Sequence, residues 1–175
     1  MESYIDYFKN TYGAQVNLGE FGAPVPDLNG NMTEREQSLY VSDLMKLFYR
    51  KRASISGLNY WTLRFGTTNL VNSDFSTREV YDTLTKYYNP GVVYGRVLNN
   101  LGEPIKNVKV RATNYDTTVV TDSNGYYSVQ LPSGNTSYTF TTLEGAVKNV
   151  EISLLPGERK EYNQRITPVE TGIIS

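Results

Sequence analysis

The spacing of apolar residues divides the chain into a first part of mixed helix and strand and a second part made of short strands. Up to residue 89, apolar positions recur at helical spacing in three stretches and form two shorter strand-like runs. The predicted helices cover residues 4–12, 33–52 and 76–88, and the predicted strands cover residues 15–18 and 55–63. The order is therefore helix, strand, helix, strand, helix.

Stop and start signals fix the ends of these predicted helices. Gly13 follows the first helix, where a glycine accommodates the left-handed conformation that ends many helices. Thr33 with Glu36, and Ser76 with Glu79, have the spacing of capping boxes, in which each side chain satisfies a backbone donor at a helix start. We expect the second and third helices to begin at these two boxes.

Alternation of helices and strands favours βα units with parallel strands. Parallel sheets need several strands and cover on both faces, and a complete βα barrel has about 250 residues. We therefore expect residues 1–89 to be a piece of a larger domain.

Short strands separated by turn residues fill the rest of the chain. Six candidates cover residues 92–98, 108–113, 117–121, 126–131, 137–142 and 148–154, and a weaker one covers 161–166. Each is bounded by Gly, Pro, Asn or Asp, the pattern of a small β-sandwich. We predict an all-β sandwich of about seven strands at residues 90–167 and a tail at 168–175.

Composition narrows the possible chemistry. The formal net charge of −1 gives no overall field to attract nucleic acid, and no apolar run approaches the roughly 18 residues of a membrane span. With no Cys and no His, a thiolate or imidazole site is excluded. We expect no cofactor and no metal; Asp122 and Asn124 have calcium-type oxygens but fit a plain turn better.

One carboxylate and one aromatic residue occupy matching positions in the two predicted βα units. Glu20 follows the first predicted strand, and Trp61, the only Trp, lies at the matching end of the second. In a βα barrel this is the face on which active sites form. An indole beside a carboxylate suits a sugar, although a surface carboxylate and a core Trp are the structural alternatives.

The residues around both positions resemble a family. Val16-Asn17-Leu18-Gly19-Glu20-Phe21-Gly22 and Gly57-Leu58-Asn59-Tyr60-Trp61 look like strands seven and eight of the retaining glycoside hydrolase clan that includes cellulases and mannanases. The resemblance implies that residues 1–89 are the last two βα units of a TIM barrel. It also implies that Glu20 is the nucleophile and that Trp61, with Asn59 and Tyr60, binds the substrate, a carbohydrate. The clan carries its acid/base carboxylate on strand four, which is not present here, so we expect the chain alone to be inactive.

The second part resembles the carboxypeptidase regulatory-like domain, a transthyretin-like sandwich. The segments that carry the resemblance are Gly95-Arg96-Val97, Gly102-Glu103-Pro104-Ile105, Val108-Lys109-Val110, Thr121 to Tyr127 and Leu131 to Gly134. That domain is a non-catalytic accessory module on many secreted and surface enzymes.

Two functions follow from these patterns. The first is the C-terminal portion of a retaining glycoside hydrolase joined to an accessory sandwich. The alternative is a non-catalytic cell-surface or carbohydrate-binding spacer protein that carries a barrel remnant. Both imply an extracellular or cell-surface location, and neither fixes the sugar or the oligomeric state.

Overall fold

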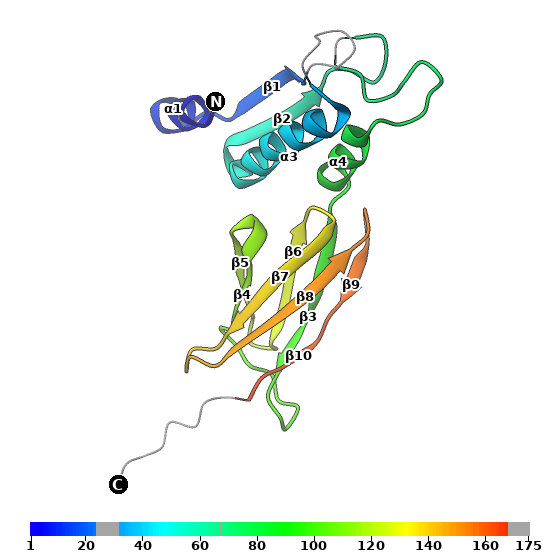
Figure 1. The fold of residues 1–175 in the computed structure, drawn as a ribbon. Helices are drawn as coiled ribbons and strands as arrows, with labels where there is room; N and C mark the ends of the chain where they lie inside the picture. Colours follow the sequence, from blue (N-terminus) through cyan, green and yellow to red (C-terminus); the bar gives the residue numbers. More distant parts are fainter. Residues whose placement is uncertain (24–31, 67, 168–175) are drawn as a thin grey trace. The chain divides into compact units, whose positions relative to one another are not determined.

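The computed structural model describes residues 1–23, 32–66 and 68–167. The chain forms two compact units, Met1–Tyr87 and Tyr88–Ser175, which are described separately (Figure 1). Residues 24–31 and the tail predicted at 168–175 lie outside the described residues.

The first unit has the predicted order of helices and strands. Its elements are α1 (Glu2–Tyr12), β1 (Val16–Phe21), α3 (Glu34–Arg50), the 3-10 turn η1 (Arg52–Ser54), β2 (Ile55–Tyr60) and α4 (Glu79–Tyr88). Strands β1 and β2 pair in parallel, as expected for a β-helix-β unit. Two strands do not by themselves establish a barrel.

Two of the predicted helix signals are confirmed. Gly13 ends α1 in the left-handed conformation, with φ of 64°. At the start of α3, the Glu36 carboxylate accepts the backbone N–H of Thr33 at 2.7 Å, and Thr33 Oγ1 accepts the N–H of Glu36 at 3.2 Å. The Thr33 N–H, and after it the Thr33 hydroxyl that also donates to this carboxylate at 2.9 Å, lower the pKa of the Glu36 carboxyl.

The predicted capping box at Ser76 is wrong. Helix α4 begins only at Glu79, so Ser76 lies three residues before it. The Ser76 hydroxyl instead donates to Asp74 Oδ1 at 2.6 Å and accepts from Asn72 Nδ2 at 3.0 Å. The Ser76 hydroxyl is therefore bonded to the preceding loop and does not cap the helix. Ser and Asp side chains generally form such local hydrogen bonds in competition with helix formation.

An aromatic core holds the helices against one face of the strand pair. The Phe21 ring makes edge contacts with Phe48 and Tyr60, each at 5.3 Å between centroids. Figure 1 shows α3 and α4 on the same side of β1 and β2. The buried members of this core are Ile5, Phe21, Ala23, Val41, Met45, Phe48, Val80 and Leu84. On the strands, Asn17, Ser56 and Asn59 are exposed instead.

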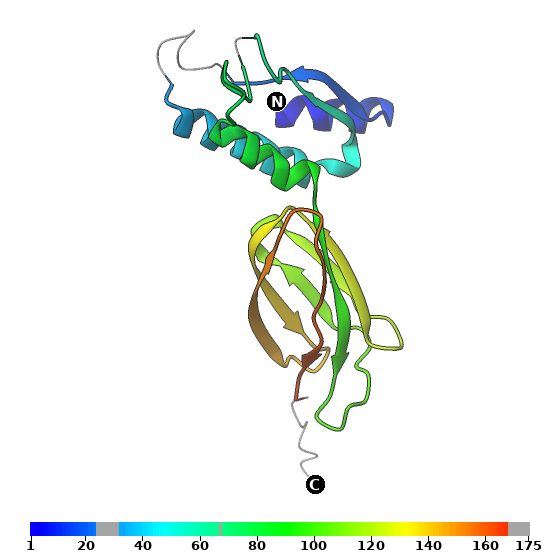
Figure 2. The ribbon, with the colours of Figure 1, turned by 90° about the vertical axis from the view of Figure 1, so that its right-hand side faces the viewer.

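The second unit is a sandwich of two four-stranded sheets (Figure 2). One sheet has the order β10-β3-β6, with β9 also paired to β3, and the other has the order β5-β4-β7-β8. The strands are β3 (Gly91–Leu98), β4 (Lys109–Ala112), β5 (Thr117–Val120), β6 (Tyr126–Leu131), β7 (Gly134–Thr141), β8 (Val147–Leu154), β9 (Arg159–Glu161) and β10 (Gln164–Arg165). The weak seventh strand of the sequence pattern is thus two short strands with a break between them.

Buried tyrosines and phenylalanine join the two sheets. Tyr127 of β6 meets Phe140 of β7 edge to face at 5.5 Å between centroids. The Tyr127 hydroxyl donates to the backbone carbonyl of Tyr162 at 2.7 Å. Tyr138 is fully buried and belongs to the same core.

The turn between β5 and β6 forms as predicted. Gly125 has φ of 69°, and a Cβ there would lie 2.5 Å from the Val97 carbonyl oxygen. The Asp122 carboxylate accepts the backbone N–H groups of Asn124 and Tyr126 at 2.8 and 2.9 Å. This carboxylate therefore serves the turn, and the described residues contain no acidic or His cluster suited to a metal.

None of the helices among the described residues is long and apolar enough to cross a bilayer.

The Tyr127 hydrogen bond gives a pH-dependent prediction. Burial, followed by the neighbouring tyrosines Tyr138 and Tyr162, raises the pKa of the Tyr127 hydroxyl well above its usual value of about 10. The stability that its neutral form provides is complete below about pH 10 and is lost as the pH rises toward the folded-state pKa. Tyr127→Phe should cost roughly 1 kcal/mol at neutral pH, and this deficit should shrink above pH 10.

Urea denaturation followed by far-UV circular dichroism measures this difference, while the emission of Trp61 follows the first unit separately. Tyr126→Phe is the matched control, because Tyr126 is its exposed neighbour on β6. A deficit for Tyr127→Phe that stays constant from neutral pH to pH 11 or so would contradict the assignment.

Candidate functional site

Glu20 lies at a bulge near the carboxyl end of β1. Leu18 pairs with Leu58 and Phe21 with Tyr60, so three steps along β1 oppose two steps along β2. Gly19 and Glu20 occupy the irregular stretch, and both are exposed. A bulge bends a strand and redirects its side chains, and bulges are frequent beside active sites. The predicted strand stopped at Leu18, whereas β1 continues through Glu20 to Phe21.

Trp61 is the first residue after β2, and its backbone extends the strand pair by one step. Its N–H donates to the Phe21 carbonyl at 2.8 Å. The Trp61 side chain is 54% exposed, so it is not the core Trp of the structural alternative. Phe21 pairs with Tyr60. Glu20 precedes Phe21 and Trp61 follows Tyr60, so both residues lie beside this pair at one edge of the sheet.

Gly22 gives the Trp61 backbone the room it needs. A Cβ at Gly22 would lie 2.6 Å from the Trp61 carbonyl oxygen and 2.9 Å from Thr68 Cγ2. The same carbonyl accepts a hydrogen bond from the Thr68 hydroxyl. The chain after β1 and the loop after β2 are therefore in close contact directly beside Glu20 and Trp61.

The structure separates the two other predicted substrate-binding residues. Asn59 is exposed on β2, on the side opposite the aromatic core. Tyr60 is half-buried, and its ring packs against Phe21. Burial raises the pKa of the Tyr60 hydroxyl, and the backbone of Ala23 partly offsets this. Asn59 is thus placed for a ligand, while Tyr60 mainly supports the strand end; both binding roles stay predictions.

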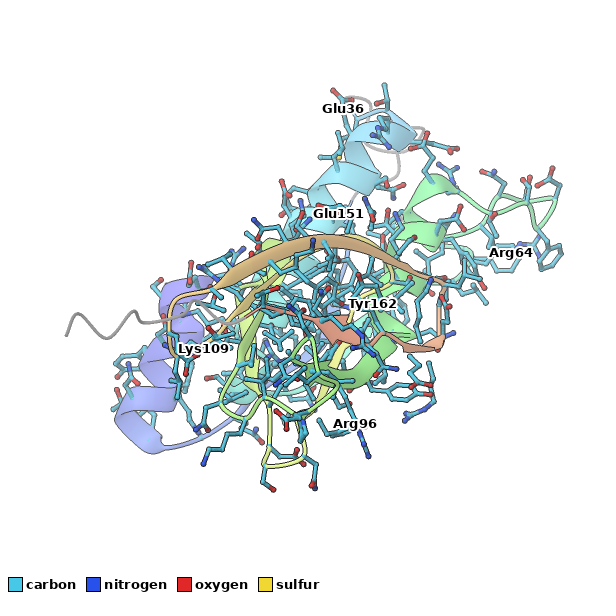
Figure 3. All side chains as sticks on the ribbon, turned by 90° about the horizontal axis from the view of Figure 1, so that it is seen from below. Glu36, Arg64, Arg96, Lys109, Glu151 and Tyr162 are labelled. Carbon is cyan, nitrogen blue, oxygen red and sulfur yellow. The ribbon has the colours of Figure 1, made fainter. Side chains whose placement is uncertain are left out.

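A cation held between two aromatic rings lies in the loop that follows Trp61. The Arg64 guanidinium carbon is 4.2 Å from the centre of the Phe65 ring and 3.8 Å from that of Phe75, and Figure 3 labels this side chain. Arg64 also donates to the Ser73 carbonyl at 2.5 Å. Both phenylalanines are largely exposed and have positive φ, a conformation that no sequence pattern predicted.

The chemistry of this edge follows from its side chains. Trp61 offers an exposed apolar face suited to the C–H face of a sugar, and Glu20 and Asn59 offer hydrogen-bonding groups. No hydrogen bond or ion pair joins Glu20 to another residue in the described part of the chain. The edge can bind a polar ring compound, but one carboxylate alone does not supply both acid and nucleophile.

Comparison with known families identifies the second unit. Residues 92–167 match the family model of the carboxypeptidase regulatory-like domain. This confirms the resemblance that the sequence showed for the sandwich. The match does not extend to residues 1–91, and the chain has no significant sequence match among curated proteins.

Solved structures share only part of this chain. The TIE protein of Bacillus anthracis is 22% identical over 46% of this chain and 17% of its own, with a TM-score of 0.37. The major pilin subunit BcpA of Bacillus cereus is 12% identical over 46% of this chain and 31% of its own, with a TM-score of 0.37. A putative carbohydrate-binding protein of Bacteroides uniformis is 17% identical over 45% of this chain and 41% of its own, with a TM-score of 0.36. The chain thus spans less than half of each, and scores this low do not establish a common fold for the whole chain.

The close contact at Gly22 gives a testable prediction. Gly22→Ala should displace the Trp61 carbonyl, destabilise the first unit by about 1–3 kcal/mol and change the Trp61 emission spectrum. Gly19→Ala is the control, because nothing lies within 4 Å of a Cβ added there. Urea denaturation followed by Trp61 fluorescence compares the two variants. Equal stability and equal spectra for both would show that the contact is not present in solution.

Proposed function

We propose that this chain is a non-catalytic, polysaccharide-associated protein of the cell exterior. Residues 1–89 are a remnant of a glycosidase (β/α)8 barrel, and the sandwich is its accessory or spacer module. One observation carries this proposal: Glu20 is the one carboxylate on a strand within the described residues of the first unit. Retaining hydrolysis needs two carboxyl groups about 5 Å apart on either side of the sugar.

The other described carboxylates of the first unit are in positions unsuited to that partnership. They lie on helices or in the loop before α4: Glu2, Asp6, Glu34, Glu36, Asp43, Asp74, Glu79 and Asp82. Several already have structural partners. Lys51 contacts Glu2 and Asp6 at 3.2 and 2.8 Å, and Arg78 lies 3.6 Å from Glu34. Asp74 accepts from Ser76. None of them offers a free acid at the end of a strand.

Barrel ancestry for the first unit is supported by its topology and its two faces. A parallel pair linked through a helix, with its functional side chains at the carboxyl ends, is the repeating unit of such barrels. The helices cover the face that carries Leu58 and Tyr60, and the exposed Asn17 and Asn59 lie on the other face. Parallel strands are normally buried on both faces, so this pair resembles part of a larger sheet.

The sandwich supports the accessory role. The family it matches is, by the resemblance drawn from the sequence, a non-catalytic module of secreted and surface enzymes. A location outside the cell follows from that role and belongs to the same proposal.

A second candidate is a working part of a retaining glycoside hydrolase, with Glu20 as nucleophile and Trp61, Asn59 and Tyr60 in the substrate site. The bulge at Gly19 and Glu20, with Trp61 at the same sheet edge, favours this candidate. It requires an acid/base carboxylate supplied from outside the chain.

Hydrolysis of oligosaccharides by the purified chain tests whether the chain is non-catalytic by itself. Purified chain should release no more new reducing ends than buffer from cello- or manno-oligosaccharides, because the leaving sugar must be protonated and one carboxylate cannot perform both proton transfer and attack. Glu20→Gln should be indistinguishable from the unchanged chain. Hydrolysis that disappears in Glu20→Gln would overturn the proposal and establish the enzyme.

A further inference from the structure

A groove lies along β3 on the sheet that contains β10, β3 and β6. It encloses about 870 Å³ and is lined by residues of β3, β6, β8, β9, β10 and the break between the last two strands. Its chemically active side chains are Tyr94, Arg96, Tyr126, Lys148, Glu161 and Arg165. No function described above uses any of them.

The groove follows from an interruption in the parallel pairing beside β3. Strand β9 pairs with residues 92–94 and β10 with residues 97–98, and Tyr162 and Asn163 leave the ladder between them. Tyr162 N–H donates to the Tyr94 carbonyl at 2.7 Å, and Asn163 Oδ1 accepts the Arg96 N–H at 2.8 Å. A Cβ on Gly95 would lie 2.1 Å from the Tyr162 carbonyl oxygen. The break is therefore a specific structure and not a frayed edge.

An arginine and a tyrosine that line this groove are cross-strand partners. Arg96 of β3 pairs with Tyr126 of β6 in the antiparallel register, which brings their side chains together on the outer face of the sheet. Arg96 extends away from the ribbon (Figure 3), and Tyr126 is 41% exposed. Tyr94 lies two residues earlier on the same face, with the Arg159 guanidinium 5.6 Å from its ring centre.

The groove is cationic in a chain that is slightly acidic overall. Arg96, Lys148 and Arg165 line it, against the single carboxylate Glu161, which already accepts from Asn163 Nδ2 at 2.9 Å. Within the described residues neither Arg96 nor Lys148 has a carboxylate partner. Two unpaired cations, with the exposed Tyr126 and the half-buried Tyr94 in the same groove, provide both an anion-binding group and a stacking surface.

We propose that this groove binds an acidic polysaccharide whose sugar rings carry carboxylates. In a uronate the carboxylate is attached to the ring, so one residue can place its C–H face on Tyr126 and its charge on Arg96. Neighbouring uronates then meet Lys148 and Arg165. This assignment rests on the proposed association with polysaccharide and names the class of sugar that the sandwich takes.

Affinity electrophoresis of the full chain tests the assignment. Native gels containing polygalacturonate should retard the chain, gels containing neutral hydroxyethylcellulose should not, and about 0.5 M NaCl should weaken the retardation. Arg96→Gln should lower the affinity at least about tenfold, as expected on loss of one charge-assisted hydrogen bond. Tyr126→Val should lower it to a similar extent while keeping a residue that favours strands.

Lys109→Gln is the matched control, since Lys109 is an exposed cation on β4 in the other sheet (Figure 3). It should bind like the unchanged chain, and circular dichroism of all variants should show the same fold. Any one of three results overturns the proposal. These are no retardation by polygalacturonate, equal retardation by single-stranded DNA, or an equal loss of affinity for polygalacturonate in Lys109→Gln and Arg96→Gln. None of these results bears on hydrolysis, so the groove and the proposed function fail separately.

Discussion

The parallel pairing of β1 and β2 is the constraint on which the first unit depends. Because α3 returns the chain to the same end, both strands finish at one edge of the sheet. The Trp61 N–H then bonds to the Phe21 carbonyl, and the Phe21 ring anchors that edge against Phe48 and Tyr60. Glu20 and Trp61 are therefore neighbours through the fold, although 40 positions separate them in the sequence.

The sandwich depends on a different constraint: strand β3 must be paired along both of its sides. Strand β3 is paired with β6 on one side and with β9 and β10 on the other. The Tyr127 hydroxyl holds the Tyr162 carbonyl where the second pairing breaks. The same break opens the groove beside Arg96, so the interaction that completes the sandwich also shapes its proposed ligand site.

The sequence predicted most of the architecture. The sandwich strands follow a period of two between Gly, Pro, Asn and Asp turns, and β6 was predicted to the residue. The helices of the first unit could be predicted because their apolar residues recur at regular helical spacing.

The predictions that fail concern element ends, where local interactions decide the structure. Ser76 bonds to Asp74 and not to a helix start, and the bulge carries β1 past Leu18. The placing of Arg64 between Phe65 and Phe75, and that of Arg96 beside Tyr126, depends on backbone conformation and strand register, which no short motif encodes.

We propose that the edge bearing Glu20 and Trp61 contacts sugar without cutting it. Trp61 is the only Trp in the chain, so its fluorescence reports this edge alone. Titration with cello- and manno-oligosaccharides should change its emission saturably, because a ring stacked on the indole displaces water from it. The oligosaccharide should be recovered intact. Emission that stays unchanged at millimolar sugar, or recovery of shortened sugar, would contradict the account.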